Sequence, residues 1–237
     1  MAEKIKISEL KNSKAEKRII LSTGFRNVDT AIGYRMYDPV TNELMHVNRG
    51  MLSGGIITVI GASHTGKSTW CAQVLANMAR PWIISGDTRV KIHFFSIEDG
   101  IDANRFRVTA KLSLEDVDNH IIFEENKSIE AVKKCILEDV KAKQEKDYQM
   151  IQTRNHMGQP ILIHHPTFIL IDSVTKLVTD KVQDLKNDTT NAMYMQVAGE
   201  LDRFLKQHGN IFQKYNITLM STAHTGIKID PNAMPGM

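Results

Sequence analysis

Short, nearly continuous apolar segments alternate along the chain with segments whose apolar positions recur at helical spacing. The continuous segments cover residues 56–60, 92–97, 121–123, 168–171 and 217–220. Strands of this kind are typical of parallel sheets that are buried on both faces. The pattern therefore predicts an α/β fold, with a mostly parallel central sheet and helices on both faces. Ligands of such sheets bind at the carboxyl ends of the strands.

Helical spacing follows three of these strands. The apolar positions are Trp70, Val74, Leu75 and Met78 in the first helix, Ile129, Val132, Ile136 and Val140 in the second, and Tyr194, Val197, Leu201, Phe204 and Leu205 in the third. We expect the first helix to end at Arg80 and Pro81, because a residue before proline disfavours helical backbone.

The chain contains no internal repeat or low-complexity tract, which predicts one core over residues 21–237. Residues 1–20 carry a local basic excess. We interpret them as a solvated basic leader, with a nucleic-acid arm or a docking segment for a neighbouring subunit as alternatives. Polar residues fill the segment from about 141 to 160, so we expect an exposed insertion within residues 141–165.

Composition excludes several classes of protein. With 42% hydrophobic residues in 237, the chain is neither disordered nor fibrous. Cys71 and Cys135 are too few for a disulfide framework and too distant in sequence for a metal clip, which favours a reducing cytoplasm. No apolar run approaches the roughly 18 residues of a membrane span. The net charge of +3 permits nucleic-acid binding without indicating it.

One segment carries a specific chemical signal. Residues 61–68, GASHTGKS, match the pattern G-x-x-x-x-G-K-[ST] and lie between a predicted strand and a predicted helix. This arrangement predicts a P-loop that binds ATP with Mg²⁺, with Lys67 reaching the β- and γ-phosphates and Ser68 ligating the ion. The residues expected to line the phosphates are Gly61, Ala62, Ser63, His64, Thr65, Gly66, Lys67, Ser68 and Thr69.

Polar residues end three of the other strands. Asp172 follows residues 168–171 and is the candidate for holding Mg²⁺, with a turn-capping aspartate as the alternative. Glu98 ends the strand after the P-loop helix and is the candidate base that activates water; Asp99 is the competing choice. His224 ends the fifth strand, where a polar side chain could sense the γ-phosphate, although a lone histidine is more often structural.

Several segments together resemble the RecA-type recombinase ATPases, bacterial and phage (UvsX-like). They are residues 21–33, 50–55 before the P-loop, 96–102, 171–177 and 203–224. The resemblance implies a RecA-like P-loop NTPase in which Glu98 is the catalytic glutamate and His224 the nucleotide-sensing switch residue. It also implies that Asp102 approaches the adenine and that Arg105 flanks the base.

The same resemblance implies a recombination or repair ATPase that binds single-stranded DNA as a head-to-tail polymer, in the cytoplasm of a bacterial or phage-infected cell. Its DNA loops would follow Asp172 and His224, with the candidate contacts Lys176, Lys181, Lys186 and Lys228, which could equally be solvated surface charges. The resemblance also implies that residue 237 falls inside the second DNA loop. We therefore expect this chain to lack the strands that close the sheet in that family. A DnaB-type hexameric helicase and an ATP-binding adaptor with weak turnover are the alternative hypotheses.

Overall fold

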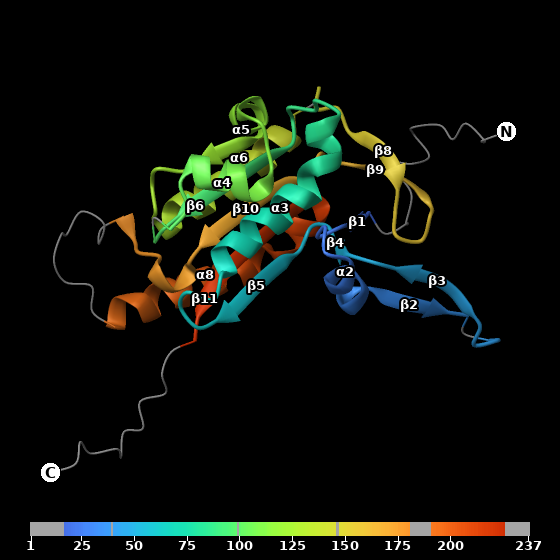
Figure 1. Ribbon diagram of the computed structural model, residues 1–237, viewed down its shortest axis with the longest axis horizontal. Coiled ribbons are helices and arrows are strands. Elements are labelled where there is room, and N and C mark those ends of the chain that lie inside the picture. Colours follow the sequence, from blue (N-terminus) through green and yellow to red (C-terminus); the bar gives the residue numbers. More distant parts are fainter. Residues whose placement is uncertain (1–16, 39, 99, 146, 181–190, 226–237) are drawn as a thin grey trace, which may run out of the picture.

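The computed structural model describes residues 17–38, 40–98, 100–145, 147–180 and 191–225. At its centre lies one sheet of five strands, all parallel, in the order β5-β11-β10-β6-β7 (Figure 1). The strands are β5 (Ile56–Gly61), β6 (Lys91–Ser96), β7 (Ile121–Phe123), β10 (Thr167–Asp172) and β11 (Ile217–His224). The five segments predicted from apolar runs are thus the five strands of this sheet, which confirms the α/β prediction.

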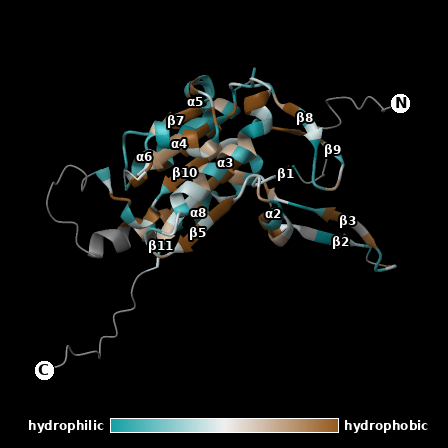
Figure 2. Ribbon diagram, viewed as in Figure 1, coloured by the Kyte–Doolittle hydropathy of each residue, from teal (hydrophilic) through white to brown (hydrophobic). Residues whose placement is uncertain are grey.

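Helices cover both faces of the sheet. One face carries α3 (Lys67–Ile84), α4 (Ala103–Ala110) and α5 (Leu114–His120), and the other carries α6 (Ile129–Lys143) and α8 (Asn191–Lys214). The pleat explains the division, because successive side chains of a strand point to opposite faces. Ile92 and Phe94 pack in the cluster under α3, whereas Phe95 packs in the cluster under α6 and α8. Figure 2 shows these apolar strands enclosed between more polar helices.

Three two-stranded sheets surround this centre. They pair β1 (Ile20–Leu21) with β4 (Met51–Leu52), β2 (Tyr34–Tyr37) with β3 (Leu44–Asn48), and β8 (Ile151–Arg154) with β9 (Pro160–Ile163), all antiparallel. Helix α2 (Arg26–Ile32) lies between β1 and the β2–β3 hairpin, which projects from the body of the molecule (Figure 1). A 3₁₀ turn, η1 (Val174–Lys176), follows β10.

Two predictions about buried and exposed segments need correction. The segment at residues 56–60 is a strand, but β5 pairs only with β11 among the described strands and lies at an edge of the sheet. Ile60 is therefore 65% exposed. The insertion expected to be exposed forms the β8–β9 hairpin, whose Ile161 and Ile163 are buried in the cluster under α3. The hairpin tip at residues 157–159 and alternate residues of β8, Gln152 and Arg154, are exposed.

Two predicted boundaries also move. Helix α3 continues through Pro81 to Ile84, because a proline so near the end forfeits one hydrogen bond while Trp82 and Ile83 pack on the core. Ile20, the last residue of the predicted leader, pairs with Leu52. Across the described ranges, none of the helices combines the length and the apolar character that crossing a membrane requires.

Candidate functional site

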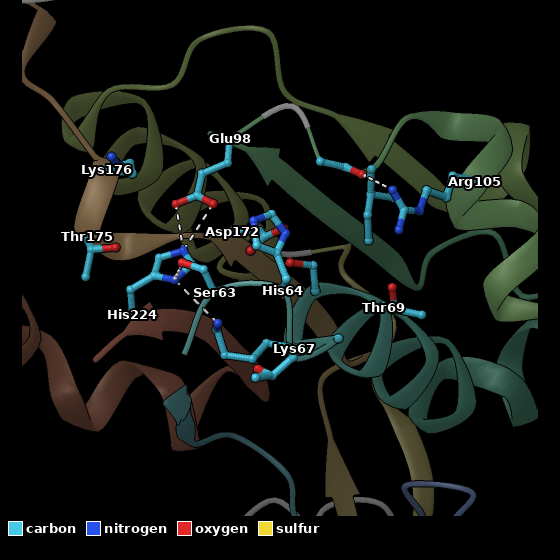
Figure 3. A pocket seen from close by; sticks show the side chains of 15 residues that line it. Ser63, His64, Lys67, Thr69, Glu98, Arg105, Asp172, Thr175, Lys176 and His224 are labelled. Atoms are coloured by element: carbon cyan, nitrogen blue, oxygen red, sulfur yellow. Dashed lines mark hydrogen bonds and ion pairs between the residues drawn. The ribbon is translucent and has the colours of Figure 1, made fainter. Parts of the chain in front are cut away.

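The carboxyl ends of β5, β6, β10 and β11 meet at one edge of the sheet and surround a cavity of about 810 Å³. It is lined by Ser63, His64, Thr65, Gly66, Lys67, Ser68, Thr69, Glu98, Gly100, Ile101, Arg105, Asp172, Thr175, Lys176 and His224. Figure 3 shows that the labelled side chains come from the loop before α3 and its first turn, from the ends of β10 and β11, from the segment after β6, and from η1 and α4. The cavity thus brings together most residues that the sequence singled out, although Gly61, Ala62 and Asp102 are not among those lining it.

The loop between β5 and α3 has the turn that a P-loop needs. Gly66, the residue before the helix, adopts a φ of +81°, which glycine reaches without a steric penalty. His64 has a φ of +61°, an uncommon conformation for a residue with a Cβ. The Lys67 ammonium is buried and donates a hydrogen bond of 2.7 Å to the carbonyl of Ala62. The loop therefore holds its own lysine at the wall of the cavity, beside Ser68.

Asp172 ends β10 in the middle of the sheet and is only 2% exposed. Its Oδ1 atom accepts a hydrogen bond of 2.5 Å from Thr222 Oγ1 on the neighbouring strand β11. The peptide bond between Asp172 and Ser173 is cis. Because the Asp172 carboxylate and the Ser68 hydroxyl line the same cavity and are hard oxygen donors, they fit Mg²⁺.

Glu98 and His224 are in direct contact, although they are 126 positions apart in the chain. The Nε2 atom of His224 lies 2.9 Å from Glu98 Oε1 and 3.1 Å from Oε2, and Ser173 Oγ donates to Oε1 at 2.8 Å. Burial alone would raise the pKa of the Glu98 carboxyl, but the hydrogen bonds from Ser173 and His224 hold that pKa below its usual value. Glu98 is therefore ionised at neutral pH.

The other ring nitrogen of His224 faces the P-loop. Its Nδ1 atom lies 3.1 Å from Ser63 Oγ and 3.4 Å from Lys67 Nζ (Figure 3). An ammonium group can only donate, so Nδ1 is an acceptor toward Lys67. We therefore assign the neutral tautomer, with the proton on Nε2 and directed at the Glu98 carboxylate. In this arrangement His224 connects the P-loop to Glu98 through a single ring.

The two residues predicted to lie beside the base differ in their contacts. Arg105 lines the cavity, and its Nη1 atom donates to the carbonyl of Gly100 at 2.8 Å. The Asp102 carboxylate instead caps α4 by accepting from the backbone N–H of Arg105 at 2.7 Å. Its approach to the adenine stays a prediction. Asp99, the alternative to Glu98, lies outside the described residues.

Of the four lysines expected to contact DNA, Lys176 is on η1 and lines the cavity. Lys181, Lys186 and Lys228 lie outside the described residues.

The sequence analysis missed Ser173 and Thr222, which hold Glu98 and Asp172 in place. Ser173 follows Asp172 directly, so a polar residue after a strand end was the available signal, whereas the pairing of Thr222 with Asp172 depends on the strand order.

The chain was compared with known families and proteins. The sequence model of a family described as an AAA domain matches residues 34–228, which include β2 through β11 and every cavity-lining residue. No significant match to a curated protein was found.

Proposed function

Because the chain belongs to the AAA domain family of P-loop NTPases, we propose that it hydrolyses Mg-ATP and couples hydrolysis to binding of single-stranded DNA in recombination or repair. We further propose that it does so as a head-to-tail polymer. The observation that carries the proposal is the His224 ring, which contacts both the P-loop and Glu98.

The chain's own side chains supply most of what hydrolysis needs. The Lys67 ammonium donates to the carbonyl of Ala62, which belongs to the loop that would bind the phosphates. A rotation of its flexible side chain would therefore bring the ammonium to the phosphate oxygens instead. Mg²⁺ held by Ser68 and Asp172 would neutralise charge on the β- and γ-phosphates. Glu98, ionised and at the cavity wall, is suited to accept a proton from the attacking water.

His224 offers a route by which the state of the nucleotide reaches other parts of the chain. Phosphate oxygens bound at the P-loop compete with Nδ1 of His224 for the donors Lys67 and Ser63. Loss of those contacts frees the ring to turn, which alters the hydrogen bond to Glu98 and the segment that follows β11. In this hypothesis His224 is a positioning residue. Its ring transmits the presence or absence of the ATP phosphates to the loops that follow Asp172 and His224.

DNA binding is supported by position and charge. Lys176 lines the cavity and is on η1, the turn that begins directly after Ser173. Because Ser173 Oγ contacts Glu98, a ligand at that turn would be close to the catalytic carboxylate. Residues 171–177 resemble the Walker B strand and the start of the first DNA-binding loop of the recombinases, which supports a contact between single-stranded DNA and this segment. Phosphate groups are the natural partner of an ammonium in that position.

Hydrolysis of ATP with and without single-stranded DNA, together with anisotropy of labelled DNA over a salt series, tests this proposal. We expect DNA to stimulate hydrolysis and affinity to fall as salt rises. Lys176→Ala should lower the slope of log K against log salt by about 1. The matched control is Lys206→Ala on α8, because Lys206 pairs with Asp202 on the exposed helix surface. This variant should change neither the stimulation of hydrolysis by DNA nor the salt dependence of DNA binding. No binding of DNA, or turnover indifferent to it, would overturn the coupling.

A further inference from the structure

A second cluster of chemically reactive side chains lies on the sheet face that α6 covers. His93 sits on β6 between Ile92 and Phe94, which point to the opposite face, so its ring points toward α6. Its Nδ1 atom is 2.7 Å from Oε1 of Glu124, the residue that follows β7. The thiol of Cys135, on α6, completes the group, and the three ligand atoms all lie within 4.8 Å of one another.

The cluster opens into a cavity of about 540 Å³ that shares no lining residue with the nucleotide cavity. Acidic side chains dominate its walls, which include Glu124, Glu130, Glu138, Asp139 and Asp180 against the single ammonium of Lys134. Such a surface attracts cations and repels phosphates. It is therefore not an extension of the ATP site.

We propose that His93, Glu124 and Cys135 bind a Zn²⁺ ion. Imidazole nitrogen, carboxylate oxygen and thiolate sulfur are the ligands that zinc takes in proteins, and three protein ligands leave a fourth position for water or a further group. The cavity provides the space for that fourth ligand, and the Glu138 carboxylate, one helical turn beyond Cys135, lines it.

The separations agree with zinc after small side-chain rotations. Zinc–ligand bonds of about 2.0–2.3 Å put neighbouring ligand atoms of a tetrahedral site roughly 3.3–3.8 Å apart. The His93–Glu124 pair, at 2.7 Å, must open slightly, whereas the sulfur must approach from a separation of at most 4.8 Å. The ion would therefore tie the middle of β6 and the residue that follows β7 to α6.

An ion pair between His93 and Glu124 accounts for two of the three groups without any metal. It does not account for the thiol beside them. Cys135 has no disulfide partner among the described residues, and the sequence argument against a clip between the two cysteines stands, because Cys71 is on α3 under the other face. The thiol is thus the diagnostic ligand.

The test is a titration of the whole chain with Co²⁺, which reports a thiolate ligand through a near-ultraviolet charge-transfer band, followed by displacement with Zn²⁺. We expect one Co²⁺ per chain with this band. Cys135→Ser should abolish the band, and His93→Gln should weaken binding at least about 10-fold. Cys71→Ser and His224→Gln are the matched controls and should keep both the band and the affinity, since His224 belongs to the nucleotide cavity.

Absence of the band in the parent chain would overturn the proposal. So would a band that survives Cys135→Ser and disappears in Cys71→Ser, or binding that His93→Gln leaves unchanged. The far-ultraviolet circular dichroism of each variant checks its folding. If one of the two ligand variants fails to fold, the other decides the outcome.

Discussion

Asp29 shows how one carboxylate organises the segment that leads into the P-loop domain. Its two oxygens accept hydrogen bonds from the Ser22 hydroxyl and from both the N–H and the hydroxyl of Thr23, at 2.6–2.8 Å. The Thr23 carbonyl in turn accepts from Asn77 Nδ2 on α3. Gly24 has a φ of +78°, and a Cβ there would lie 2.1 Å from that amide nitrogen. Asp29 and residues 22–24 therefore dock this segment on α3.

Asp29→Ala should destabilise the fold by about 2–3 kcal/mol, because it leaves the buried N–H and hydroxyl of Thr23 without an acceptor. Chemical denaturation gives the free energy of unfolding. Thr30→Ala, the adjacent position on the exposed face of α2, should change it by less than about 0.5 kcal/mol. Equal free energies for the two variants would show that Asp29 does not hold this segment.

His224→Ala should move the acidic limb of the pH–rate profile to higher pH. The hydrogen bond from His224 helps to keep the pKa of the Glu98 carboxyl below its usual value, so its removal raises that pKa. Glu98 then becomes protonated, and inactive as a base, at a higher pH. The profile of kcat/KM measures the shift in the free enzyme. An acidic limb at the parent's pH would mean that the ring does not act on Glu98.

Among the elements, the β8–β9 hairpin is the one whose role the sequence concealed. It brings His164 and His165 to the start of β10, where His164 packs between the rings of Tyr148 and Tyr215. Its Nδ1 atom is buried with no hydrogen-bond partner among the described residues. Burial and the nearby Lys143 lower the pKa of His164 to about 4.

His164→Phe should make stability less sensitive to pH. Since the folded pKa of about 4 lies below the unfolded value near 6.5, protonation favours the unfolded chain. The stability is fully present above pH 6.5 and is lost as the pH falls toward 4. Between pH 7 and pH 5 the parent should lose about 1–2 kcal/mol that the variant retains. Urea denaturation at the two pH values measures this loss of unfolding free energy. Equal losses in the parent and the variant would contradict the attribution of the pH dependence to His164.

The sequence predicted the strands of the central sheet and their chemistry better than it predicted the surroundings. Apolar runs locate Ile56–Gly61 and Thr167–Asp172 because each strand is a local pattern. Burial is not local, which is why the edge position of β5 was missed. The short apolar run in Pro160–Ile163 was hidden by polar neighbours, and its burial depends on pairing with β8 and packing under α3.

Motif reasoning found the P-loop, Glu98, Asp172 and His224 for a physical reason. Parallel strands end at a common edge, so residues at those ends converge whatever their separation in the chain. The contact of His224 with Glu98 and the cluster of His93 with Cys135 both required knowledge of which strands are neighbours and which face each residue occupies.

At the scale of the whole molecule, the chain has two cavities of opposite character that share no lining residue. The nucleotide cavity is at the carboxyl edge and contains Lys67, Lys176 and Arg105, whereas the acidic cavity lies under α6. Polymer formation is the remaining part of the proposed function, and it can be observed directly in electron micrographs. Filaments on single-stranded DNA would favour the recombinase hypothesis, and rings that unwind forked duplexes would favour a helicase.

The central claim is that Glu98, held by His224 and Ser173, is the base of an ATPase. The most direct measurement is the steady-state release of phosphate from saturating Mg-ATP by the parent and by Glu98→Gln, with binding of a fluorescent ATP analogue measured in parallel. We predict that the variant binds the analogue normally and releases phosphate at least about 100-fold more slowly, the usual contribution of a general base. A variant that hydrolyses ATP as fast as the parent would contradict the account.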